Sequence, residues 1–134
     1  MIFISVLLFN TIVSFGQLNI SKECKQSKTT VLTIGSNKIT NDPKLGYLLE
    51  VKGSEIYYFI SLGKTKKEAS ETLNDLKEIA DFDLFVYSSM FNSEMFIYGD
   101  KLTTGKKIVR FKSPAFSGSA YISSENLEKF ILSF

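Results

Sequence analysis

The stretch "LGYLLEVKGSEIYYFIS", residues 45–61, decides the fold. Two apolar runs flank the tripeptide Lys52-Gly53-Ser54. A short connection that carries glycine between two such runs is typical of a β-hairpin. Both runs place apolar side chains on successive as well as alternate positions, which is typical of strands covered on both faces. We therefore expect a central hairpin in a sheet, with helices packed on one face and loops or a partner on the other.

A helix is expected directly after this hairpin, over residues 66–80. Thr65 is followed three residues later by Glu68, which makes a capping box at the start of a helix. Apolar residues then recur at helical spacing on one face. They are Ala69, Leu73, Leu76 and Ala80, with Ile79 at the edge of the face.

The rest of the chain reads mainly as short strands. Residues 29–35 are a β-branched run that predicts a first strand, and residues 36–44 are rich in turn formers and predict a loop. Four further strands are expected, over residues 83–88, 94–99, 106–112 and 119–123. A second amphipathic helix begins at an N-cap, Ser123 or Ser124, and runs to the last residue; its apolar face holds Leu127, Phe130, Ile131 and Phe134.

The element order β-β-β-α-β-β-β-β-α predicts an α+β fold, because strands that follow one another through short turns pair antiparallel. We expect one mostly antiparallel sheet of about six to seven strands with two amphipathic helices, forming a single domain over residues 29–134. Each half ends in strands and then a helix, which hints at a duplicated unit.

The N-terminal residues predict export. Residues 2–15 are almost wholly apolar, and Ser14 and Gly16 fit the small-residue pattern of a secretory cleavage site. The run is shorter than the roughly 20 apolar residues that span a bilayer, so no stable membrane span is expected after cleavage. We expect a signal peptide over residues 1–16, a disordered leader over residues 17–28, and a secreted or periplasmic protein. The alternative is that the apolar run is a buried N-terminal strand.

Residue types exclude several kinds of chemistry. The chain has no histidine and one cysteine, Cys24, which removes histidine-based catalytic triads, histidine metal ligation and thiolate zinc sites. No metal, cofactor or catalytic residue is therefore expected. Cys24 cannot form an internal disulfide; it is either an intermolecular link or a free thiol in the leader.

The net charge and the spacing of motif residues argue against binding of nucleic acid or of a nucleotide. The formal net charge is only +2, and Arg110 is the only arginine. Gly63-Lys64-Thr65 lies between a strand and a helix, as in a P-loop, but Tyr58 stands where the first glycine of that motif belongs. In the strand 106–112, the basic residues alternate with apolar ones, which indicates a solvent-facing side or a charged edge strand.

Two surface features are candidate binding sites. Lys64, Lys66 and Lys67 crowd the start of the first helix, where positive charge opposes the helix dipole. They form either a patch for an anion or an acidic partner, or a solvated surface. Met90 and Phe91, expected in a loop between strands, are the exposed apolar pair that a protein partner would contact.

We therefore expect a small exported, non-catalytic domain that binds an unknown protein partner, as an inhibitor, adaptor or envelope accessory factor. One alternative is a histidine-independent enzyme that uses carboxylates and lysine; Asp81, Asp83, Glu94 and Asp100 are its candidate acids. Another is a structural subunit that self-associates through edge strands. The excess of lysine over arginine, with many Phe and Ile, suggests a bacterial genome rich in A and T.

Overall fold

A computed structural model describes residues 29–90, 93–115 and 117–134, and shows the expected α+β architecture. The first sheet contains β1 (Thr29–Ile34), β2 (Asn37–Asp42), β3 (Gly46–Lys52) and β4 (Tyr57–Gly63). The second contains β5 (Phe85–Met90), β6 (Ser93–Lys101), β7 (Lys107–Lys112) and β8 (Ser119–Ser123). Helix α2 (Lys66–Asp81) follows the first sheet and α3 (Ser124–Ser133) follows the second. The two halves thus share the same element order.

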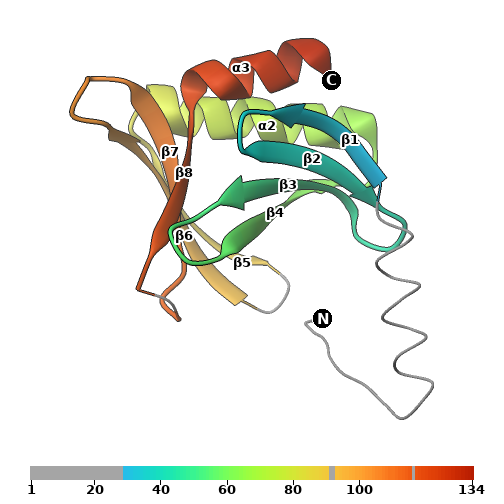
Figure 1. Cartoon of the computed structure of the whole chain (residues 1–134), viewed down its shortest axis with the longest axis horizontal. Coiled ribbons are helices and arrows are strands. Elements are labelled where there is room, and N and C mark those ends of the chain that lie inside the picture. The colour runs from blue at the N-terminus through green and yellow to red at the C-terminus, as the bar shows by residue number, and fades with distance from the viewer. Residues whose placement is uncertain (1–28, 91–92, 116) are drawn as a thin grey trace.

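The strands of each sheet run in sequence order and pair antiparallel. The two helices lie side by side and cover one side of the strands (Figure 1). Helix α2 packs on β4, β6 and β7, and α3 packs on β1, β7 and β8. The core fills the space between helices and strands, and its largest fully buried side chains include Phe111, Phe130, Leu49, Leu73 and Ile122.

Strand β2 corrects the sequence prediction, which made residues 36–44 a loop. Ile39 is its only large apolar residue, so the run lacks the alternation that identifies a strand. Its backbone is instead held by pairing with β1 on one side and β3 on the other. A tight turn through Gly35, whose φ is +62°, connects β1 to β2 so that the two strands pair antiparallel.

The strands also form two four-stranded sheets where one sheet was expected. The hairpin 45–61 is confirmed as β3 and β4, but β4 lies at the edge of its sheet and is not central. The hairpin tip joins the two sheets. Gly53 forms an isolated bridge with Ala120 of β8, and the Tyr58 hydroxyl donates a hydrogen bond of 2.9 Å to the carbonyl of Gly118.

Both helices begin where their capping residues predicted. The Thr65 hydroxyl accepts a hydrogen bond of 3.1 Å from the amide of Glu68 at the start of α2. The Ser123 hydroxyl accepts one of 3.1 Å from the amide of Asn126 at the start of α3. Ser123, rather than Ser124, is therefore the N-cap of the second helix.

The N-terminal expectations fall outside this structure. The signal peptide (1–16), the leader (17–28) and Cys24 precede the first described residue, so they stay predictions. Within the described part of the chain, neither helix has the length and apolar character needed to cross a membrane.

Candidate functional site

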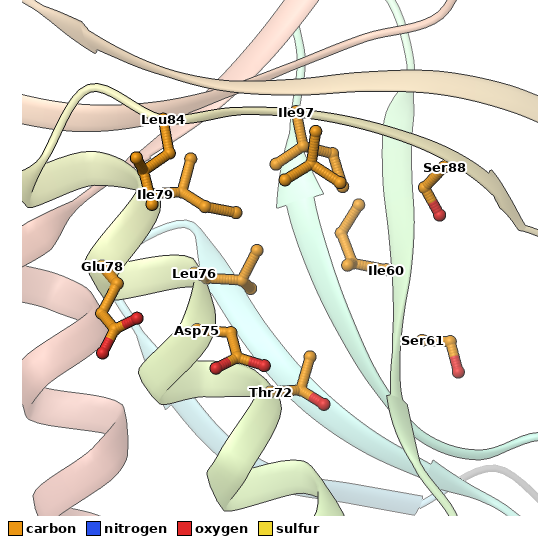
Figure 2. A pocket seen from close by; sticks show the side chains of 11 residues that line it. Ile60, Ser61, Thr72, Asp75, Leu76, Glu78, Ile79, Leu84, Ser88 and Ile97 are labelled. Atoms are coloured by element: carbon orange, nitrogen blue, oxygen red, sulfur yellow. The ribbon is translucent and has the colours of Figure 1, made fainter.

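A pocket of about 460 Å³ opens between the C-terminal half of α2 and the strands β4, β5 and β6. Its wall is apolar and comes from all four elements, as Figure 2 shows. The wall residues are Ile60, Leu76, Ile79, Leu84, Val86 and Ile97. Polar side chains line the rest of it: Ser61, Thr72, Asp75, Glu78 and Ser88. Asp75 and Glu78 are exposed, so the pocket combines an apolar interior with an acidic rim.

The turn that leads from α2 into β5 positions one wall of this pocket. Asp83 has a φ of +55°, which reverses the chain directly after the helix. The amide of Leu84 then donates a hydrogen bond of 3.1 Å to the carbonyl of Ile79, and the amide of Gly99 donates one of 2.9 Å to the carbonyl of Leu84. These bonds tie the start of β5 to both the helix end and β6.

Strand β5 lies at an edge of the second sheet and pairs with β6 on one side. Because the carbonyl of Leu84 bonds to Gly99, the alternation of an antiparallel ladder fixes which residues face β6. The backbone N–H and C=O groups of Phe85, Tyr87 and Ser89 therefore point away from β6, toward the edge. Among the described residues, no strand pairs with β5 on that side.

The side of the second sheet that faces away from the helices carries an aromatic surface. We call the side chains of Phe85, Tyr87, Phe96, Tyr98 and Tyr121 the aromatic face. Its ring centroids lie 5.8 Å apart for Phe85 and Phe96, 6.1 Å for Phe85 and Tyr98, and 5.3 Å for Tyr87 and Phe96. Phe85 is 64% exposed, Tyr87 52% and Tyr121 43%.

Charged groups on this surface hold one another in place. Arg110 donates hydrogen bonds of 3.0 Å to Asp100 and 3.2 Å to the Ser119 hydroxyl, and it lies 5.5 Å from the centre of the Tyr121 ring. The backbone amide of Lys101 and the Arg110 guanidinium lower the pKa of the Asp100 carboxyl. The face thus combines exposed rings with a positioned guanidinium.

A hydrogen bond between Tyr87 and Glu94 also belongs to the aromatic face. This bond raises the pKa of the Tyr87 hydroxyl, since the neighbouring carboxylate disfavours the phenolate. Glu94 is thus the polar neighbour of Tyr87 at this end of the aromatic face.

The predicted lysine patch does not line the pocket. Lys64, Lys66 and Lys67 are all exposed at the other end of α2. The amide of Lys64 donates a hydrogen bond of 2.8 Å to the Glu68 carboxylate, and the Lys66 ammonium lies 5.4 Å from the centre of the Phe134 ring. Part of the N-terminal helix end is thus already occupied by Glu68 and by Thr65.

The predicted apolar pair lies at the far end of β5. Met90 is the last residue of that strand and pairs with Ser93, whereas the prediction placed it in a loop. Phe91 lies outside the described residues, so its predicted role in binding stays a prediction.

The strand whose basic residues alternate with apolar ones is β7. The sequence predicted that it has a solvent-facing side or lies at the edge of a sheet. Arg110 and Lys112 lie on the side away from the helices, while Val109 and Phe111 are buried in the core. Arg110 and Lys112 are partly exposed there, but Ile108, which the alternation placed on the same side, is buried. The edge reading is wrong, because β7 lies between β6 and β8.

Of the carboxylates suggested for an acid–base pair, Asp81 and Asp100 have other partners. Asp81 accepts hydrogen bonds of 2.7 Å from Lys77 and 2.6 Å from the Ser124 hydroxyl, and these two bonds lower its pKa. A general acid needs a raised pKa instead. In residues 29–90, 93–115 and 117–134, no group of three or more Cys, Asp or Glu side chains gathers to hold a metal ion.

No protein-family model matches the chain, no curated protein matches its sequence, and no solved structure matches its fold. The surfaces of the chain itself are therefore the guide to its function. Sequence reasoning did not identify the pocket, although the acidic residues at the C-terminal end of the first helix, which include Asp75 and Glu78, are visible in the sequence as charges that oppose the helix dipole.

Proposed function

We propose that the protein is a small exported, non-catalytic domain that binds another protein through the aromatic face of its second sheet. The observation that carries the proposal is the exposure of Phe85, Tyr87 and Tyr121 on a sheet face opposite the helices. Contiguous exposed apolar surface is typical of interaction sites, and aromatic and arginine side chains are enriched at the centres of protein interfaces.

The aromatic face is also suited to tight binding because its side chains are already ordered. The rings pack on one another, and Arg110 is held by Asp100 and Ser119. Ordering of mobile side chains costs roughly 0.5–1.5 kcal/mol each when an interface forms. A face that is ordered beforehand avoids much of this cost.

The enzymatic alternative has less support from the pocket. Asp75 and Glu78 are the carboxylates that such an enzyme would use. Among the described residues that line the pocket there is no lysine or arginine, so an enzyme that uses a carboxylate and a lysine would lack its lysine there. The acidic rim fits a role in binding positively charged groups.

Export is part of this proposal. It is supported by the apolar run 2–15 and by Ser14 and Gly16, the small residues expected at a signal-peptide cleavage site. N-terminal sequencing of the protein recovered from its native cells tests it. The expected mature chain begins at Gln17 and is found outside the cytoplasm. A full-length chain in the cytoplasm contradicts export. It does not bear on binding through the aromatic face, which the next experiment tests.

Cross-linked capture from native cells, followed by affinity measurement with the purified partner, tests the binding surface. Tyr87→Ala should weaken the affinity by about tenfold or more, as expected for a central aromatic residue. Tyr57→Ala is the matched control, because Tyr57 is 51% exposed on β4 of the other sheet. Equal affinity of both variants and the unaltered protein refutes the assignment of the aromatic face.

A further inference from the structure

We infer that the partner contributes an extended segment that pairs with the outer edge of β5 and places a lysine or arginine side chain in the pocket beneath α2. This inference rests on the proposed function, since it specifies how a protein partner is held. Four observations carry it. The outer edge of β5 has unpaired backbone groups, and its sequence has no charged residue or proline that would prevent pairing. The side chains of β5 alternate between the pocket and the aromatic face, and the pocket carries acidic residues.

The edge of β5 presents a row of backbone groups in the geometry that another strand recognises. The N–H and C=O groups of Phe85, Tyr87 and Ser89 point away from β6, and the described residues pair no strand with them. Addition of a peptide strand to such an edge is a common mode of peptide recognition.

Strand β5 also lacks the features that keep edge strands from pairing. Its sequence, FVYSSM, contains no charged residue and no proline. Natural proteins usually place lysine, proline or a bulge on an exposed edge to prevent such pairing. The unprotected edge is therefore consistent with a strand position that a partner occupies.

The side chains of an added strand would alternate between the two faces of the sheet. On β5, Val86 and Ser88 line the pocket, whereas Phe85 and Tyr87 belong to the aromatic face. Every second side chain of the partner segment would thus enter the pocket, and the others would lie beside the aromatic face. One segment engages both surfaces at once.

The charge around the pocket selects a basic side chain. Asp75 and Glu78 line the pocket together with an apolar wall that includes Ile79 (Figure 2). A lysine or arginine places its aliphatic stem along such a wall and its charged end at the carboxylates.

The same charges disfavour a second copy of this chain as the occupant. A second β5 strand, with the sequence FVYSSM, would present no lysine or arginine side chain to Asp75 and Glu78.

The probe is the acetylated and amidated peptide Thr-Val-Thr-Lys-Thr-Val-Thr, in which valine and lysine share one face of a strand. Titration of the mature chain, followed by backbone amide NMR, should show saturable binding with shifts along β5 and around the pocket. Two peptides methylated on alternate nitrogens, one for each set, test the pairing: the peptide whose methylated nitrogens face β5 should bind about tenfold more weakly, and the other should still bind. Replacement of the lysine by glutamate should abolish detectable binding.

Two sets of variants separate the strand contact from the charge contact. Ser89→Pro removes one outward-facing amide, which an edge strand tolerates, and should weaken binding about tenfold relative to Ser89→Ala. The double variant Asp75→Asn with Glu78→Gln should weaken binding about fivefold. Glu71→Gln, an exposed charge change on α2 outside the pocket, should leave binding unchanged.

The outcomes distinguish this inference from the proposed function. If the probe does not bind, or if both methylated peptides bind as well as the unmethylated one, strand addition is refuted, while loss of partner affinity in Tyr87→Ala would still support the aromatic face. If the unliganded chain dimerises in sedimentation experiments and Ser89→Pro dissolves the dimer, the occupant is a second copy, and the inference of a basic partner is overturned.

Discussion

The substitution Gly99→Ala tests the junction between α2, β5 and β6 that forms one wall of the pocket. A methyl group at Gly99 would collide with the carbonyl oxygen of Ile79 and lie 2.8 Å from Cα and 3.2 Å from the nitrogen of Asp83. These neighbours are backbone atoms, so no side-chain rotation relieves the clash. Gly99 has no positive φ, and the effect is therefore steric.

The expected cost of Gly99→Ala is about 3 kcal/mol, near the top of the usual range for overpacking, because the helix end and β6 must separate. For a domain of this size, that corresponds to a fall in the melting temperature of roughly 12 °C. Urea denaturation followed by circular dichroism measures the free energy of unfolding directly, and an unchanged m-value would show that the transition remains two-state.

Gly105→Ala is the matched control for this prediction. Gly105 has a φ of +88°, and a methyl group there would meet no atom within 4 Å, so its cost is conformational only, about 1–2 kcal/mol. The two variants thus separate a steric cause from a backbone cause. If Gly99→Ala unfolds at the same urea concentration as the unaltered protein, the close approach of β6 to the end of α2 is wrong.

Three further predictions concern stability. The folded pKa of Asp81 is lowered from 3.8 by Lys77 and Ser124, so its contribution is fully present above that pH and is lost as the pH falls below it. Urea titrations between pH 2 and 6 should show a shallower acid-induced loss of stability for Asp81→Asn; equal pH dependence of the two proteins would contradict the pairing. Thr65→Ala should cost about 1 kcal/mol through loss of the N-cap, measured by urea denaturation against Lys67→Ala, and an equal effect of both would count against the cap. Phe130→Ala should cost roughly 3–5 kcal/mol because the ring is fully buried, and a calorimetric melting temperature near that of the unaltered protein would disprove its place in the core.

Much of the local structure could be predicted because local signals carry it. Helix α2 begins at Lys66, as the Thr65 capping box indicates, and its buried residues follow the predicted apolar face. The sequence missed β2, since backbone pairing with two neighbours holds a strand with a single large apolar residue. Residue types at 37–42 carry no sign of those neighbours.

The candidate site was predicted less well than the fold. The sequence pointed to Lys64 and Met90 as site residues rather than to Asp75 or Val86. The pocket joins residues from α2, β4, β5 and β6. Their proximity depends on how the two sheets are placed under one helix, which no single segment encodes.

The sequence by itself determines where the two helices begin and where the hairpin of β3 and β4 turns, because caps, turn residues and apolar runs act over a few neighbouring residues. Only the tertiary structure decides that the strands divide into two sheets, that β4 and β5 lie at their edges, and that an acidic pocket lies between them. The physical reason is that strand pairing satisfies backbone hydrogen bonds in the same way for any neighbour. The choice of neighbour is made by the packing of the whole core beneath α2 and α3.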